Sequence, residues 1–204
     1  MEQKCDNFFD CDDGSDENDC KILQVDKKSY RKEYPPIRGR GVKQHVQVSV
    51  TILTLGEFED ITMSYRCKFH LILKWFDKRL TYHNLKKDMY KNNLGKEELE
   101  MIWIPPVLFN NTLKIMSYRD NGNPKIHIEK RGKHFVAPPS IIDENFYYLG
   151  SHNTLHLQSE HDLILHCNYE LLCYPFDTQT CTLEVRKNNN IIDVNIYKLK
   201  GILF

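Results

Sequence analysis

The chain has 204 residues, with 28 basic and 28 acidic side chains, so its formal net charge is zero. This balance excludes the attraction to nucleic acid or to an anionic membrane surface that a strongly basic protein has. No run of about 18 apolar residues occurs, so the sequence predicts no segment that spans a bilayer.

The first 20 residues form an acidic, cysteine-rich segment. The stretch CDNFFDCDDGSDENDC at 5–20 holds three cysteines and seven acidic residues, with little apolar surface to bury. Such a segment needs cross-links or a metal to fold. Its dense carboxylates suit Ca²⁺, which takes ~6–8 oxygen ligands.

The pattern C-D-x-x-x-D-C-x-D-G-S-D-E-x-x-C in this segment resembles the second half of a low-density-lipoprotein-receptor class A module. The resemblance implies a Cys5–Cys20 disulfide. It leaves Cys11 without its upstream partner, because the first three cysteines of the module are not in the chain. A disordered acidic leader is the alternative. The resemblance also implies a Ca²⁺ site that uses the carbonyl oxygens of Gln3 and Phe8 and the side chains of Asp6, Asp10, Asp16 and Glu17.

Residues 21–44 are polar and contain Pro35-Pro36, and they predict a short helix followed by a turn-rich linker. The period then changes to two, because apolar and polar residues alternate in HVQVSVTIL at 45–53. That alternation predicts a half-buried strand, and GEFED at 56–60 predicts a turn after it.

The most regular pattern in the chain lies between Ile61 and Trp75. Every odd position in this stretch is apolar, and Ile72 is the single apolar residue at an even position. The sequence therefore predicts one long strand with one face in the core and the other in a polar environment. After this strand, Asp77 and Arg79 can form an ion pair and are expected to be structural, as is Trp75.

Beyond residue 80 the sequence predicts loops and short strands, with no helix longer than three turns. Residues 81–100 indicate loop and weak strand. The run IWIPPVLF at 102–109 is broken by two prolines, which favours an edge strand or a loop. These elements together predict an antiparallel all-β sandwich. The remaining strand candidates are IMSY, KIHIE, ENFYYL, LHL, DLILH, TCTLEV and IIDVNIY.

The stretch CNYELLCYPFDTQTC at 167–181 encloses an aromatic-proline step between two cysteines. A chain reversal is expected at 174–177, before the strand TCTLEV. A Cys167–Cys181 disulfide would hold this reversal as a compact exposed loop. In the chain-entropy model a ring of this size stabilises by ~3 kcal/mol.

This cysteine ring around aromatic-P-F-D resembles the signature loop of the pentameric Cys-loop ligand-gated ion channels. Three further motifs of that family follow in the same order: YRKEYPP at 30–36, WFDKRL at 75–80 and IWIPPVLFNN at 102–111. The resemblance covers residues 22–199.

The resemblance implies an immunoglobulin-like twisted sandwich of about ten strands over residues 45–204, after the linker 21–44 and the module 1–20. It also implies that the last strands and the transmembrane helices follow Phe204. The signature loop and the first β-turn would press on those helices, and residues 56–60 would lie opposite the loop. The coupling residues would then be Glu57, Phe58, Glu59, Tyr174, Pro175, Phe176 and Asp177.

The binding site of this family is an aromatic box that holds an ammonium group by cation–π attraction. The resemblance assigns to it His70 on the long strand and, after Trp103, the residues Leu108, Phe109 and Asn110. Most of the aromatic residues of the box are missing. Either the ligand is not an amine of the usual kind, or the chain supplies only the complementary face of the site.

Cys67 and Cys173 lie on the core-facing sides of their predicted strands and remain, with Cys11, once the other pairs are assigned. They form either a disulfide or two buried thiols.

Two other patterns have weaker functional readings. The sequon Asn110-Asn111-Thr112 is expected to carry no glycan, because a glycan there would obstruct the binding loop. A histidine-rich segment has residue types that could bind zinc or sense protons, but its spacing does not place all members on one strand face. Its members are His152, His156, His161 and His166.

The leading hypothesis is the extracellular ligand-binding part of a channel subunit at the plasma membrane, within a homo- or hetero-pentamer that binds a small-molecule transmitter. Seven cysteines indicate an oxidising compartment, yet the polar N-terminus is no signal peptide, so a longer secretory protein is expected. The alternatives are a soluble secreted transmitter-binding pentamer and a Ca²⁺-dependent adhesion protein. An enzyme is not expected, since the sequence has no phosphate loop or nucleophile elbow.

Overall fold

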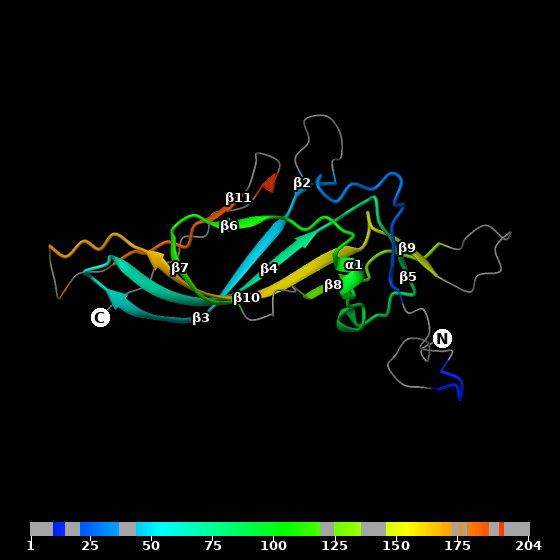
Figure 1. Ribbon diagram of the computed structural model, residues 1–204, viewed down its shortest axis with the longest axis horizontal. Coiled ribbons are helices and arrows are strands. Elements are labelled where there is room, and N and C mark those ends of the chain that lie inside the picture. Colours follow the sequence, from blue (N-terminus) through cyan, green and yellow to red (C-terminus); the bar gives the residue numbers. More distant parts are fainter. Residues whose placement is uncertain are drawn as a thin grey trace. The chain divides into compact units, whose positions relative to one another are not determined.

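The computed structural model describes residues 10–14, 21–36, 44–118, 125–135, 146–172, 176, 179–187 and 192–193. Figure 1 shows that strands dominate them. The chain forms two compact units, each assembled from three separated segments. Unit 1 comprises Met1–Pro36, Phe76–Trp103 and Ile126–His156, and unit 2 comprises Ile37–Trp75, Ile104–Lys125 and Leu157–Phe204.

Unit 1 contains a three-stranded antiparallel sheet of strands β1 (Leu23–Gln24), β5 (Thr81–His83) and β9 (Tyr147–Leu149), in that order. Leu23, Tyr82 and Tyr148 face one another across this sheet and are all buried. The single-turn helix α1 (Lys96–Leu99) is tied to β1, because the Glu98 carboxylate accepts hydrogen bonds from the backbone N–H groups of Ile22 and Leu23 at 2.9 and 2.8 Å.

The short helix predicted within residues 21–44 is wrong for the part that the structure describes. Leu23–Gln24 form β1 instead, and residues 27–29 and 32–34 form turns. The Asp26 carboxylate accepts hydrogen bonds from the Lys28 N–H and the Ser29 hydroxyl, at 3.0 and 2.7 Å. These bonds close a single turn and satisfy the groups that would otherwise begin a helix.

Unit 2 is built on two long strands, β3 (Gln47–Glu59) and β4 (Ser64–Trp75), followed in the sheet by β10 (Thr154–His166) and β7 (Thr112–Tyr118). Strand β8 (Lys125–Glu129) also pairs with β10; apart from Lys125 it belongs to unit 1, as does the start of β10 at Thr154–His156. Two smaller pairs complete the described strands: β6 (Val107–Phe109) with β11 (Val185–Lys187), and β2 (Gln44–His45) with β12 (Ile192–Asp193). Only the last of these pairs is parallel.

The apolar face of β4 is the core of unit 2, as its period-two pattern predicts. Its odd positions from Tyr65 to Trp75 are at most 2% exposed. The strand β6 packs on this face, since the Phe69 and Phe109 rings meet edge to face with centroids 5.4 Å apart. The second strand layer over β4 is what a β-sandwich requires. The all-β antiparallel fold is therefore confirmed, with a 3-10 turn at Met89–Lys91 and α1 as its described helical segments.

Two strand boundaries differ from the prediction. The long strand begins at Ser64 rather than Ile61, because Asp60–Met63 form the hairpin turn and Ile61 is 91% exposed. For the same reason GEFED is not the turn itself: Gly56–Glu59 still belong to β3. Backbone pairing continues past Gly56 because a register shift between Gly56 and Glu59 takes up the extra residues.

Candidate functional site: the hairpin and disulfide end of unit 2

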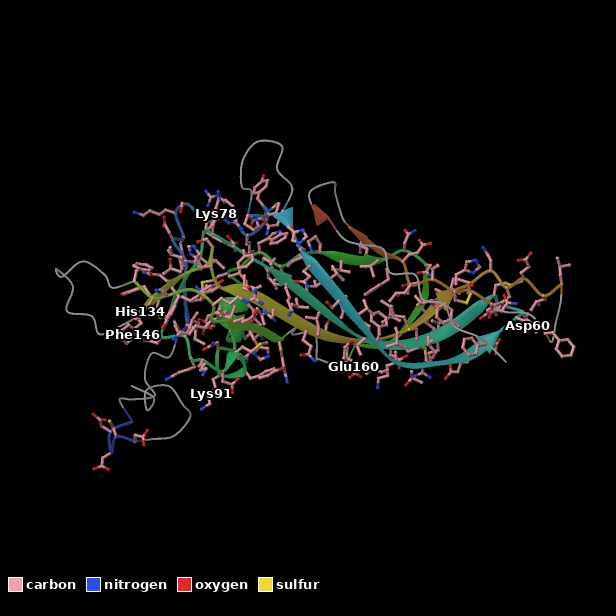
Figure 2. All side chains as sticks on the ribbon, turned by 180° about the vertical axis from the view of Figure 1, so that it is seen from behind. Asp60, Lys78, Lys91, His134, Phe146 and Glu160 are labelled. Carbon is pink, nitrogen blue, oxygen red and sulfur yellow. A yellow bond between two sulfur atoms is a disulfide. The ribbon has the colours of Figure 1, made fainter. Side chains whose placement is uncertain are left out.

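The β3–β4 hairpin ends in a tight turn at Asp60–Met63. The turn is closed by a hydrogen bond from the Met63 N–H to the Asp60 carbonyl at 3.3 Å, and the Asp60 carboxylate accepts the Ile61 N–H at 2.9 Å. Figure 2 shows Asp60 at the tip of this hairpin. Glu57 and Met63 have positive φ values of 50° and 48°, a conformation that few residues with a side chain adopt.

The ring closed by the Cys167–Cys181 disulfide starts beside the turn of this hairpin. The cysteine Cα atoms lie 5.3 Å apart, within the usual range for a disulfide. Inside the ring the Gln179 side-chain amide accepts from the Glu170 N–H and donates to the Glu170 carbonyl, both at 2.9 Å. This reciprocal pair of hydrogen bonds joins the two sides of the ring.

Two hydrogen bonds fasten the ring to the hairpin. The Cys167 N–H donates to the Met63 carbonyl at 2.8 Å, and the Tyr169 hydroxyl donates to the Ser64 carbonyl. A third hydrogen bond lies just after the ring, where the Tyr65 hydroxyl of β4 donates to the Thr182 carbonyl at 3.1 Å. The hairpin tip and the disulfide ring are thus one connected structure.

This connected end carries large apolar side chains that face solvent. Ile61, Leu172 and Phe176 are 91%, 90% and 93% exposed, which is unusual for residues of this size in a soluble domain. Of the predicted coupling residues, Glu57, Phe58 and Glu59 lie on the hairpin and Phe176 on the ring. The others, Tyr174, Pro175 and Asp177, lie outside the described residues.

The four predicted ligand-binding residues do not surround one cavity. His70 is on the polar face of β4, with Nε2 3.3 Å from Glu160, which also pairs with Lys68 at 3.1 Å. Phe109 contacts Phe69, which is the neighbour of His70 and therefore points to the opposite face of β4. Leu108 is 51% exposed, and the Asn110 side chain donates to Glu184 at 3.0 Å. Within one chain, His70 and Phe109 are separated by the sheet.

His161 is a residue that the sequence reasoning did not place. Its ring stacks on Phe69 with centroids 5.2 Å apart and meets Phe109 edge to face at 4.9 Å. The Ser159 hydroxyl lies 2.9 Å from Nε2, and burial lowers the pKa of His161 to about 4. Leu155, Leu157, Leu163 and Leu165 are odd-numbered core residues of the same strand, so the period of β10 could have placed His161 in the core.

The other histidines of this segment do not join His161. His156 belongs to unit 1, where its Nε2 lies 2.8 Å from the Glu129 carboxylate. Among the residues that the structure describes, no group of three histidine, cysteine or acidic side chains could hold a metal ion. Of the predicted Ca²⁺ ligands only Asp10 is described, in the stretch 10–14, where the Gly14 N–H bonds the Cys11 carbonyl at 2.9 Å.

The predicted Cys67–Cys173 disulfide is wrong. Cys67 is a free thiol at 0% exposure on the apolar face of β4, and burial raises its pKa to about 12. It packs as a small apolar side chain. Cys173 lies outside the described residues.

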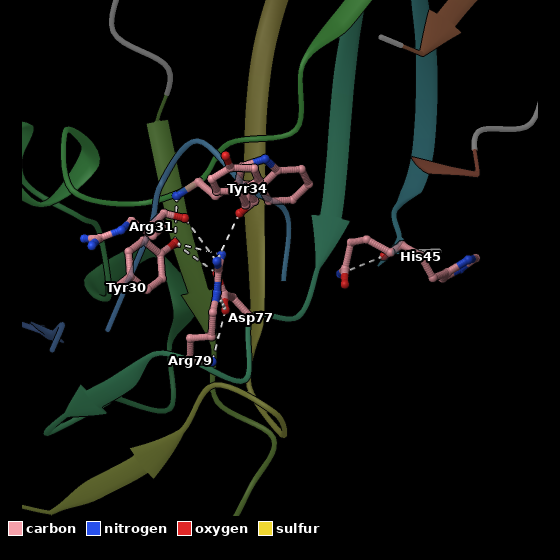
Figure 3. A network of polar contacts seen from close by, with 8 residues as sticks. Tyr30, Arg31, Tyr34, His45, Asp77 and Arg79 are labelled. Carbon is pink, nitrogen blue, oxygen red and sulfur yellow. Dashed lines mark hydrogen bonds and ion pairs between the residues drawn. The ribbon is translucent and has the colours of Figure 1, made fainter. Parts of the chain in front are cut away.

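The WFDKRL motif builds a buried polar network in unit 1, shown in Figure 3. Asp77 is 0% exposed and holds the Arg79 guanidinium through two hydrogen bonds of 2.9 and 2.7 Å, which confirms the predicted ion pair. The Tyr30 hydroxyl donates to Asp77 at 3.0 Å and accepts the Trp103 N–H at 2.8 Å. The motifs around Tyr30, Asp77 and Trp103 therefore meet in one place and stabilise the unit.

The sequence matches the family described as "Neurotransmitter-gated ion-channel ligand binding domain" over residues 20–145. The chain belongs to this family. Two relatives are the glycine receptor subunit beta-type 4 of Caenorhabditis elegans and the acetylcholine receptor subunit delta of Xenopus laevis. Each is 22% identical to the chain, over 185 and 162 residues respectively.

As a neurotransmitter-gated channel ligand-binding domain, the chain covers one part of a longer kind of protein. The two alignments include 87% and 78% of the chain, but only 34% and 26% of the relatives. The Cys167–Cys181 ring lies beyond the residues of the family match, so the disulfide is an independent observation. No helix among the described residues is long and apolar enough to cross a membrane.

Proposed function

We propose that this ligand-binding domain is the extracellular part of a pentameric ligand-gated ion-channel subunit at the plasma membrane, and that it transmits binding of a small-molecule transmitter to a transmembrane pore. The observation that carries the proposal is the disulfide-closed ring hydrogen-bonded to the β3–β4 hairpin in a chain of this family. Transmitting a movement from the ligand site to the pore needs a rigid contact surface, and a disulfide-closed ring bonded to a hairpin supplies one.

The exposed apolar side chains of the hairpin tip and the disulfide ring support a contact with a further apolar surface. Ile61, Leu172 and Phe176 would each bury most of their side chain against such a surface. Removing apolar area from water contributes ~25 cal/mol per Å². A membrane-embedded helical bundle offers the surface that these side chains lack in the isolated chain.

The positions of the ligand-binding residues support assembly of several copies. His70 lies on the polar face of β4, whereas Phe109 of β6 packs against the opposite face, so a single copy cannot surround a small ligand with both. Two neighbouring copies around a closed ring can bring opposite faces together, because each interface of a cyclic oligomer joins two different surfaces. The ligand site would then lie between subunits.

The test is expression of the full-length transcript product in oocytes under voltage clamp, with a panel of amines, amino acids and protons as agonists. The expected result is an agonist-gated current that is lost in the Cys167→Ser/Cys181→Ser variant although the protein still reaches the surface. A pentamer that is secreted and binds an agonist without any current would identify the soluble alternative. A monomer that binds none of the panel would contradict the proposal.

We propose further that residues 1–20 form part of a class A module and bind Ca²⁺ through Asp6, Asp10, Asp16 and Glu17 with the carbonyls of Gln3 and Phe8. The support is the seven carboxylates between Cys5 and Cys20, since Ca²⁺ prefers oxygen ligands. Isothermal titration of the secreted protein with Ca²⁺ tests this. Binding that survives in an Asp16→Asn/Glu17→Gln variant would contradict the assignment, and a Ca²⁺-dependent binding partner would favour an adhesion role.

A further inference from the structure

The hairpin contains a backbone irregularity that a regular strand would avoid. Glu57 is held at φ 50°, next to the register shift between Gly56 and Glu59. This left-handed region is unfavourable for a residue with a side chain, and glutamate gains no local hydrogen bond there as asparagine does. An interaction elsewhere must compensate for the cost, or the strand would regain regular pairing.

Arg66 supplies that interaction from the partner strand. Its Nη1 bonds the Glu57 carboxylate, while its Nε and Nη2 donate to the two oxygens of Asp162 on β10, both at 2.8 Å. One planar guanidinium therefore joins β3, β4 and β10. The two-pronged contact with Asp162 fixes the plane of the group, because both of its bonds must stay in line.

The two carboxylates differ in how firmly they hold Arg66. The Asp162 side chain is 9% exposed, and its pKa is lowered by the hydrogen bonds from Arg66. The Glu57 side chain is 59% exposed, so water can replace Arg66 as its partner at little cost. Asp162 is thus the fixed anchor of Arg66, and Glu57 is the contact that can open.

We propose that Arg66 is a clasp that holds the β3–β4 hairpin tip in its bulged register, and that release of Glu57 from Arg66 is a built-in conformational switch of the tip. The proposal rests on the proposed coupling function, to which it adds a positioning residue. When the clasp opens, the backbone at Glu57 relaxes to negative φ and the register beyond Gly56 shifts. The turn then moves relative to Cys167, whose N–H bonds the Met63 carbonyl.

Neighbouring ion pairs provide a matched control. Lys68 bonds Glu160 at 3.1 Å on the same face of β4 and β10, two residues further along each strand. Lys68 lies opposite Thr54, a residue without positive φ. Loss of that pair removes a similar charge contact beside the other register shift of the hairpin, between Ile52 and Thr54, where no residue has a positive φ.

The test is hydrogen exchange by mass spectrometry on the secreted chain without any agonist, read in peptides that cover residues 57–66. We expect Glu57→Ala to raise exchange about tenfold, because it removes the contact but keeps the unfavourable backbone. Glu57→Gly should return exchange to within about twofold of the unmodified chain, since glycine adopts positive φ readily. Lys68→Gln should also stay within about twofold.

Exchange in Glu57→Ala that equals the unmodified chain would overturn the clasp. Equal exchange in the alanine and glycine variants would overturn the role of the backbone at Glu57. Because these measurements need no agonist and no pore, they decide the clasp independently of the channel experiment. In a channel that does respond, Glu57→Ala should shift the half-maximal agonist concentration and Glu57→Gly should not.

Discussion

Replacing Asp77 by alanine should destabilise the chain more than any surface change. The Asp77 carboxylate is fully buried and accepts four hydrogen bonds: from the Arg79 N–H, Nε and Nη2, and from the Tyr30 hydroxyl. Arg79 also donates to the carbonyls of Arg31 and Tyr34 at 3.1 and 3.0 Å, so it cannot simply turn to solvent. Breaking a buried ion pair on one side costs about 3–5 kcal/mol.

That loss is a large fraction of the ~5–15 kcal/mol by which a typical domain is stable. For a chain of this length it corresponds to a melting temperature lower by about 6–20 °C. Urea unfolding followed by tryptophan fluorescence, together with thermal melts, measures the change. The control is Arg131→Ala, which breaks the Glu129–Arg131 pair, whose Arg131 side chain is 54% exposed, and should cost below about 1 kcal/mol. The reasoning fails if Asp77→Ala costs no more than this control.

Three further outcomes are expected. Loss of the ring in Cys167→Ser/Cys181→Ser should cost ~3 kcal/mol in thermal unfolding, and an unchanged melt would contradict this. The pKa of His161 is lowered to about 4 in the folded chain, so the unfolded chain binds the proton first as the pH falls from ~6.5. The free energy of unfolding should therefore drop by ~3 kcal/mol between pH 6.5 and 4. In His161→Phe this dependence of stability on pH should be flatter. Cys67, with its raised pKa and full burial, should react with a thiol reagent only in denaturant, and peptide mapping that finds it labelled in the folded chain would refute its placement.

The sequence predicted the structure best where apolar and polar residues alternate over a long stretch. Alternation from Tyr65 to Trp75 can be satisfied only by a strand with one buried face, and that face is the core of unit 2. The ring from Cys167 to Cys181 was predicted through the resemblance of its sequence to the family's signature loop, because spacing alone would also allow a bond to Cys173.

Prediction failed where single side chains decide the backbone. The Asp26 carboxylate closes a turn in a segment whose composition equally suits a helix. The hairpin turn was misplaced because an irregular residue such as Glu57 has no signature in the pattern of apolar residues.

The candidate site was harder to predict than the fold. Which residues share a cavity depends on the side of β4 where each lies, and here His70 is on the polar side while Phe109 of β6 packs on the apolar side. A resemblance assigns positions along the chain, but it carries no information about a second copy of the chain. Cys67 shows the same limit, because a core-facing thiol looks alike in sequence whether or not it is bonded.

The apolar end formed by Ile61, Leu172 and Phe176 also governs how the isolated chain behaves at the bench. Three bulky apolar side chains in water should promote self-association of the isolated chain, which size-exclusion chromatography at rising concentration would detect. Mild detergent, or serine at these three positions, should keep the protein monodisperse without changing the packing of its core. Crystals grown without either should pack through that end, so a lattice contact there is no evidence of a contact in solution.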